Sequence, residues 1–180
     1  LRQPLEEKKI VVSRARYSVE YPANFTLVAA MNPCPCGYYN HPTKECTCSP
    51  GSVHRYMGRI SGPLMDRIDL HVEVTPVTPR ELSAAAPGEA SAAVRERVVR
   101  ARAVQEARFG GVEGVHTNSM MNSAMLREYC RLDAASAALL ERAMERLSLS
   151  ARAYDRILKA ARTIADLAGR ADIVQADIAE

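Results

Sequence analysis

The sequence has no tryptophan, two phenylalanines and few lysines among its 24 basic residues, and it has no long apolar run. Its longest purely apolar stretches are about five residues, as at residues 27–31, whereas a membrane span needs about 20. We therefore expect a cytoplasmic protein with no membrane contact. The sequence also lacks the phosphate-binding pattern G-x-x-x-x-G-K-[ST], a paired-acid Mg²⁺ motif and the zinc pattern H-E-x-x-H. These absences exclude a phosphate cradle within these residues and a zinc protease.

A strong excess of positive charge is missing too. The formal net charge is +3, and residues 1–90 carry 10 basic and 9 acidic side chains. Neither half is a basic tail, so any contact with phosphate must come from a few placed residues. The 180 residues are 47% hydrophobic, which is enough to bury a core and excludes a disordered chain.

The composition changes near residue 75, and this change predicts two parts. The first part is rich in Val, Thr, Tyr, Pro and Gly, and the second in Ala, Arg, Leu and Glu at helical spacing. The predicted fold class is α/β followed by all-α. We expect an α/β part at 1–78, a linker at 79–90 and a bundle of short helices at 91–180.

The α/β part is expected to contain a hairpin and two further strands. Residues 9–13 and 17–21 are β-prone, and Arg14-Ala15-Arg16 between them predicts a hairpin with a basic tip. The apolar run 25–31 suits a central strand buried on both faces, and 70–74 is a second β-prone run. Between these runs, Ser61-Gly62-Pro63 is typical of a helix start.

The second part is expected to contain several amphipathic helices. The first begins near Ser91, buries one side and stops at Gly110-Gly111. The expected buried positions of this helix are Val94, Val98, Ala101 and Val104. The later helices are expected to begin at Ser119 or Asn122, at Asp133, at Ser148 or Ser150, and near Asp172. The one that begins at Ser148 or Ser150 should end at Gly169.

Four of the five cysteines lie within fifteen residues: Cys34, Cys36, Cys46 and Cys48. Four thiolates can wrap a tetrahedral Zn²⁺, so residues 33–50 are predicted to form a zinc knuckle of structural rather than catalytic kind. Unliganded cysteines or a disulfide remain alternatives, and His41 lies where it can replace one ligand. Cys130 stands alone and is expected to be a small core residue.

Three polar residues sit where an α/β protein places ligand contacts. Asn32 directly follows the apolar run, at the edge of a sheet where ligands bind; the alternative is a plain turn residue before Pro33. Arg67 precedes the second run, where it can meet a neighbour's phosphate or form a surface ion pair. Arg152 opens a helix, where it can reach a nucleotide phosphate or belong to a solvated basic face.

These residues, in this order, resemble the Mg-chelatase-like AAA+ ATPases of the ComM/YifB type. The resemblance covers essentially the whole chain. It rests on Leu1-Arg2-Gln3-Pro4-Leu5-Glu6, Tyr21-Pro22-Ala23-Asn24-Phe25, Met31-Asn32-Pro33-Cys34-Pro35-Cys36-Gly37, Ser61-Gly62-Pro63-Leu64-Met65-Asp66-Arg67-Ile68-Asp69 and Ser150-Ala151-Arg152-Ala153-Tyr154-Asp155-Arg156. It implies the later half of an AAA+ module, a partial α/β core, followed by its helical lid.

The resemblance also implies roles for the singled-out residues. Asn32 corresponds to a sensor asparagine, Arg67 to an arginine finger and Arg152 to the sensor arginine of the lid. The hairpin at residues 9–21 corresponds to an element that faces the central channel in related ring motors, and Arg14 and Arg16 at its tip are expected to face DNA. Members of this type resemble hexameric DNA helicases that act in branch migration during natural transformation, with identical subunits and DNA as partners.

The phosphate-binding loop and Mg²⁺-binding acids of such ATPases do not occur in these 180 residues. The resemblance therefore implies a fragment that uses ATP and Mg²⁺ only within the full-length protein and is inactive alone. Two other interpretations stay open at this point. One is a stand-alone zinc-stapled module that binds nucleic acid, and the other is a motor subunit of a metal chelatase.

Overall fold

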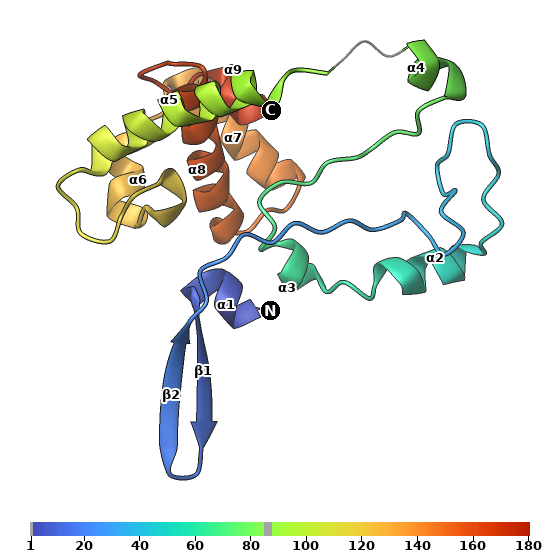
Figure 1. Cartoon of the computed structure of the whole chain (residues 1–180), viewed down its shortest axis with the longest axis horizontal. Helices are drawn as coiled ribbons and strands as arrows, with labels where there is room; N and C mark the ends of the chain where they lie inside the picture. The colour runs from blue at the N-terminus through green and yellow to red at the C-terminus, as the bar shows by residue number, and fades with distance from the viewer. Residues whose placement is uncertain (1, 85–87) are drawn as a thin grey trace. The chain divides into compact units, whose positions relative to one another are not determined.

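The computed structural model describes residues 2–84 and 88–180, which divide into two compact units, Leu1–Thr78 and Pro79–Glu180 (Figure 1). Residue 1, in the first family motif, and residues 85–87, in the expected linker, lie outside the described residues. The stretch expected to be a linker carries the short helix α4 (Pro79–Ala84).

The first unit carries a two-stranded antiparallel hairpin. It is formed by β1 (Lys9–Arg14) and β2 (Tyr17–Pro22), whose register pairs Arg14 with Tyr17. The predicted hairpin is confirmed, with Arg14 at the end of a strand and Arg16 in the turn itself. Three short helices complete the unit: α1 (Arg2–Glu7), α2 (Pro50–Met57) and α3 (Gly62–Met65). Helix α3 follows Ser61 at its N-cap and has proline in its first turn, as the sequence predicts.

The two further strands expected in this unit are not formed. Residues 25–31 and 70–74 are irregular, and the only sheet in the described part of the chain is the hairpin. Val28 is 89% exposed and Val74 is 85% exposed, so neither run is buried on two faces. A strand needs a neighbour for its backbone N–H and C=O groups. The described residues place no such neighbour beside either run, and the β-prone sequence therefore stays unpaired.

The second unit is a small helical bundle around α8 (Ala151–Leu167), which packs against α5 (Ser91–Phe109), α6 (Ser123–Tyr129), α9 (Gln175–Ala179) and the 3₁₀ turn η1 (Asn118–Met120). Helix α7 (Ala134–Arg146) packs against α9. The buried core comprises Phe109, Met121, Leu126, Cys130, Leu140, Leu158, Ala161, Ala165 and Ile173. The predicted helical half is confirmed. No helix among the described residues is both long and apolar enough to cross a membrane.

Side-chain caps explain where these helices begin. The side-chain oxygens of Asn122, Asp133 and Ser150 each accept a hydrogen bond from a backbone N–H in the first turn of the helix that follows. Such caps satisfy donors that the first turn otherwise leaves unpaired. Helix α8 ends just before Gly169, whose φ of +69° is readily adopted by glycine.

The expected buried side of α5 is right at one position and wrong at three. Ala101 is buried as expected, but Val94, Val98 and Val104 are between 37% and 43% exposed, and the helix buries Gln105 and Phe109 in their place. The physical reason is that Gln105 Oε1 accepts a hydrogen bond from the backbone N–H of Asn118. This bond satisfies a buried amide and turns the 101–105–109 stripe toward the core.

Candidate functional site

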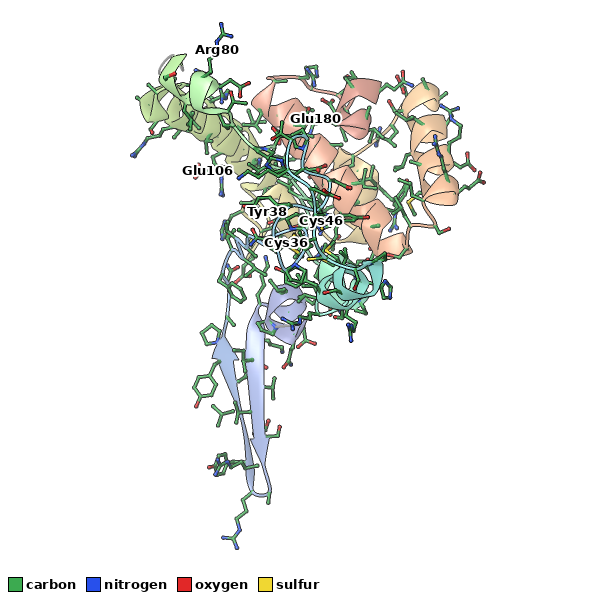
Figure 2. The ribbon with its side chains drawn as sticks, turned by 90° about the vertical axis from the view of Figure 1, so that its right-hand side faces the viewer. Cys36, Tyr38, Cys46, Arg80, Glu106 and Glu180 are labelled. Carbon is green, nitrogen blue, oxygen red and sulfur yellow. The ribbon has the colours of Figure 1, made fainter. Side chains whose placement is uncertain are left out.

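The four clustered cysteines lie at one point in the loop between β2 and α2. Their sulfur atoms all lie within 4.8 Å of one another, and Cys34 is completely buried. The Sγ of Cys34 is 3.3 Å from that of Cys36 and 3.7 Å from that of Cys46, and the Cys36 and Cys46 sulfurs are 3.6 Å apart. Figure 2 shows Cys36 and Cys46 close together, with Tyr38 nearby. The fold thus brings together all four residues that the sequence predicts as metal ligands.

These distances fit a single tetrahedral ion. Four sulfurs bonded to one zinc at about 2.3 Å lie about 3.8 Å apart at the corners of a tetrahedron. The backbone amide of Tyr38 lowers the pKa of the Cys36 thiol to about 6, so this cysteine is able to bind metal as a thiolate. The backbone hydrogen bond from Cys48 lowers the pKa of the Cys46 thiol, but burial and the hydrogen bonds with Cys36 and Cys34 outweigh it and raise this pKa to about 12. All five cysteines are free, so the structure shows no disulfide among them. The donor set is that of a closed structural zinc site.

Backbone turns and one histidine hold the loop in this shape. Gly37 adopts a φ of +83°, and its N–H donates to the carbonyl of Cys34 at 3.0 Å. His41, considered above as a substitute ligand, accepts hydrogen bonds through Nδ1 from the backbone N–H groups of Thr43 and Lys44. His41 therefore orders the loop and is not among the four clustered side chains.

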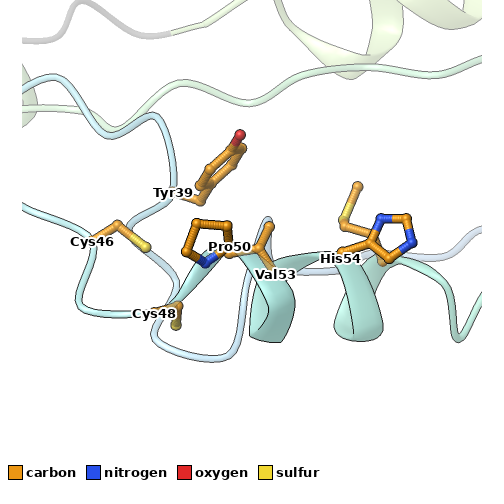
Figure 3. A pocket seen from close by; sticks show the side chains of 7 residues that line it. Tyr39, Cys46, Cys48, Pro50, Val53 and His54 are labelled. Carbon is orange, nitrogen blue, oxygen red and sulfur yellow. The ribbon is translucent and has the colours of Figure 1, made fainter.

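Helix α2 follows the cysteines directly. Ser49 caps it through its side chain, and Val53 is the buried residue of this helix. A hollow beside the cysteine cluster is lined by side chains from both segments, which Figure 3 shows from close by. The lining residues are Tyr39, Cys46, Cys48, Pro50, Val53, His54 and Met57. The cluster therefore joins a loop without regular structure to a helix, which is what a structural metal ion does in a small domain.

Asn32 is exposed and lies immediately before the cysteine loop. Together with Ala30, Met31 and Tyr56 it lines a shallow depression of the first unit. An exposed amide at this place is able to orient a water molecule or a phosphate oxygen.

Arg67 is turned toward its own unit. Its guanidinium lies 2.8 Å from the Glu6 carboxylate, its side chain is only 9% exposed, and it also donates to the carbonyl of Pro63. Its Nε is buried without a hydrogen-bond partner. In this arrangement Arg67 holds α1 against the end of α3, and an arginine-finger role requires it to leave Glu6.

Arg152 and the two hairpin arginines lie on exposed surface. Arg152 is in the first turn of α8, just after the cap residue Ser150. Arg14 and Arg16 are exposed at the end of the hairpin. Asn32 and Arg67 belong to the first unit and Arg152 to the second, so the structure does not bring the three expected catalytic residues together within one unit.

A buried polar network in the helical unit was missed by the sequence analysis. The Asp166 carboxylate is fully buried and accepts two hydrogen bonds from Arg108, at 2.6 and 2.7 Å. Arg162 and Asn118 donate to the same carboxylate. Burial opposes its ionisation, but the hydrogen bonds from Arg108 and Asn118 hold the pKa of Asp166 below its usual value. The available signal was the spacing of Arg162 and Asp166, four residues apart beside the apolar stripe of α8.

Arg162 also connects this network to the backbone that follows the C-terminal end of α8. The other guanidinium nitrogens of Arg162 donate to the backbone carbonyls of Arg170 and Ala171, at 2.8 and 2.7 Å. These carbonyls follow the C-terminus of α8, where a positive charge is favoured. The network is therefore a structural centre of the bundle.

Comparisons with known proteins place the chain in a family. Residues 1–82 match the family described as magnesium chelatase, subunit ChlI, and residues 88–180 match its C-terminal part. The chain belongs to this magnesium chelatase subunit family. Its two parts are accordingly a partial AAA+ α/β core and the helical part that follows.

Two relatives cover the chain almost completely. The chain is 46% identical over its whole length to the competence protein ComM of Haemophilus influenzae, of which it spans 34%. It is 43% identical over 97% of its length to the uncharacterized protein YifB of Escherichia coli, of which it spans 33%. The resemblance to the ComM/YifB type is thus confirmed. The chain spans about a third of the length of these relatives.

Proposed function

We propose that this chain is the sensor and arginine-finger part of a hexameric ring ATPase that acts on DNA. The observation that carries the proposal is the hairpin, which ends in two exposed arginines in a chain of the magnesium chelatase subunit family. The whole-chain similarity to a competence protein supports action on DNA. These residues do not form an ATP site by themselves, because they contain no phosphate-binding loop. In this proposal ATP and Mg²⁺ are held by another segment of a longer protein.

The proposed chemistry is phosphoryl transfer to water, in which the protein positions groups and stabilises charge. Asn32 orients the attacking water, and Arg67 approaches the transferring phosphate from the neighbouring subunit. Arg152 reaches the same phosphate from the first turn of α8. Exposed placement of Asn32 and Arg152 supports these roles. The ring of identical subunits is required because Arg67 acts on a neighbour's nucleotide.

We propose that the cysteine cluster binds one structural Zn²⁺ per chain. Elemental analysis of protein purified without added metal should find one zinc, and Cys36→Ser should lose it because three thiolates no longer close the tetrahedron. A chelator should increase hydrogen exchange in residues 33–50 and leave the helical unit protected.

The matched control for this experiment is the fifth cysteine. Cys130 is buried in the helical core, and burial raises its pKa to about 11, so Cys130→Ala should keep the zinc. Protein that contains no zinc and whose four clustered thiols all react freely would refute the metal site.

We expect the double variant Arg14→Ala and Arg16→Ala to lower DNA-stimulated ATP turnover of the full-length protein by about tenfold, since phosphate contacts supply most sequence-independent affinity. The loss should be largest at low salt, where the released counterions count most. The measurement is ATP turnover against DNA concentration at two salt concentrations. Arg95→Ala with Arg100→Ala removes the same charge from exposed positions on α5 and should change nothing. If DNA stimulates both double variants as strongly as it stimulates the unchanged protein, Arg14 and Arg16 are solvated residues that do not contact DNA.

A stand-alone nucleic-acid-binding module is the second candidate. It is favoured by the presence of both the cysteine cluster and the hairpin in the first unit. The isolated 180-residue chain should then bind labelled DNA well, with a clear salt slope. A part that needs its ring should bind DNA poorly when isolated, which is the result we expect.

The matched family description favours a third candidate, the motor subunit of a metal chelatase. ATP turnover of such a motor should not respond to DNA. DNA stimulation of the full-length protein therefore separates this candidate from the proposal.

A further inference from the structure

The two faces of the hairpin differ in chemistry. In an antiparallel pair, directly opposite residues point to the same side, and successive residues alternate between sides. The register therefore places Lys9, Val11, Ser13, Ser18, Glu20 and Pro22 on one face, called the polar face here. The opposite face, called the aromatic face, carries Ile10, Val12, Arg14, Tyr17, Val19 and Tyr21.

The polar face satisfies its own groups. Lys9 Nζ lies 2.8 Å from the Glu20 carboxylate, and this ion pair cancels the charges of that face. The hydroxyls of Ser13 and Ser18 are hydrogen-bonded to each other at 2.9 Å. The charged and hydroxyl side chains of this face are therefore paired with one another.

The aromatic face is open and bears only positive charge. Tyr17 is 60% exposed and Tyr21 is 53% exposed. Arg14 stands directly opposite Tyr17, Arg16 follows in the turn, and the face carries no acidic residue. Tyr21 lies four positions after Tyr17 in the same strand, so the two rings form two platforms about 13 Å apart along the ribbon.

We propose that this aromatic face binds single-stranded DNA, with a base stacked on Tyr17 and the adjacent phosphates held by Arg14 and Arg16. The inference rests on the proposed function and deepens it by naming the form of DNA and the means of contact. Aromatic rings interleaved with cations are the usual surface for unpaired nucleic acid, because each base offers a flat face to stack. Bases in an intact duplex are already stacked on each other and cannot use such a platform. The charge of the face also matches a phosphate backbone and not a neutral protein partner.

The test measures affinity for a fluorescein-labelled oligothymidine by anisotropy, with the full-length protein at two salt concentrations. Tyr17→Val keeps a strand-forming residue but removes the ring, and it should weaken binding by about tenfold without changing the salt slope. Tyr17→Phe keeps the ring and should bind as the unchanged protein does. Arg14→Ala should weaken binding and lower the salt slope by about one. Ser18→Ala, on the polar face, is the matched control and should have no effect.

A second measurement does not depend on the hairpin surviving substitution. An oligonucleotide containing 5-iodouracil, irradiated on the unchanged protein, should crosslink to Tyr17, because a stacked ring lies in contact with the base. Crosslinks confined to other segments would overturn the inference.

The outcomes separate this inference from the proposed function. If the arginine variants weaken binding and Tyr17→Val does not, stacking is overturned and the DNA-facing hairpin stands. If neither the arginine variants nor Tyr17→Val changes binding, both the stacking of a base on Tyr17 and the DNA-facing role of the hairpin are wrong. If Tyr17→Val lowers ring assembly in sedimentation while DNA affinity is kept, the aromatic face contacts another subunit and the inference is wrong.

Discussion

Replacing Arg67 by alanine is expected to remove nearly all ATP turnover of the full-length protein. An arginine supplied from a neighbouring subunit contributes about 10³–10⁵ in rate, because it meets the charge that develops on the transferring phosphate. Nucleotide affinity should stay nearly intact, since the interaction is made mainly in the transition state. The measurement is steady-state turnover together with nucleotide binding at equilibrium.

The ion pair of Arg67 with Glu6 supplies a sharp control. Arg67→Ala also breaks this 2.8 Å contact, so a loss of turnover alone does not distinguish a finger from a structural residue. Glu6→Ala breaks the same contact and leaves the guanidinium in place. If Arg67 is a finger, Glu6→Ala should keep turnover within a few-fold of normal. If Glu6→Ala loses as much as Arg67→Ala, the ion pair is the important feature and the finger role is wrong.

The second large effect is expected in the helical unit, at Asp166. Asp166→Asn removes the negative charge that Arg108 and Arg162 share, and leaves the buried guanidinium of Arg162 and the partly buried one of Arg108 beside a neutral amide. Removing one partner of a buried ion pair typically costs about 3–5 kcal/mol. The thermal midpoint of the helical unit, followed by circular dichroism, should fall by about 10 °C or more.

The control and the pH dependence follow from the same network. Asp172→Asn changes an exposed carboxylate and should leave the midpoint nearly unchanged. The pKa of Asp166 is lowered from its ordinary value of 3.8, so its stabilisation is complete above that value and is lost as pH falls through the lower, folded-state pKa. Asp166→Asn should remove this acid-dependent part. A variant that unfolds at the normal temperature would show that the network contributes no net stability.

The sequence predicts best those features that a few neighbouring residues determine. The hairpin follows from two β-prone runs and a short polar turn, and the helix starts follow from Asn122, Asp133 and Ser150, which cap their own first turns. The cysteine cluster also belongs to this group, because its spacing confines four sulfurs to one loop.

Features that depend on distant partners were harder to predict. Residues 25–31 have a strand-like sequence, but strand formation also needs a neighbour, and none is present in the part of the chain that the structure describes. The buried face of α5 is set by the bond from Gln105 to Asn118, which lies thirteen residues further along. Arg108 and Asp166 are 58 residues apart in the sequence, and no local sequence pattern predicts their pairing.

The central claim is that this chain supplies Arg67 to a nucleotide bound by another subunit. It is tested most directly by mixing Arg67→Ala subunits with subunits whose phosphate-binding loop is disabled, neither of which should turn over ATP alone. Mixed rings contain some interfaces that pair an intact loop with an intact arginine, so we expect partial turnover to return. If native mass spectrometry shows mixed rings and no turnover returns, Arg67 does not act across the interface.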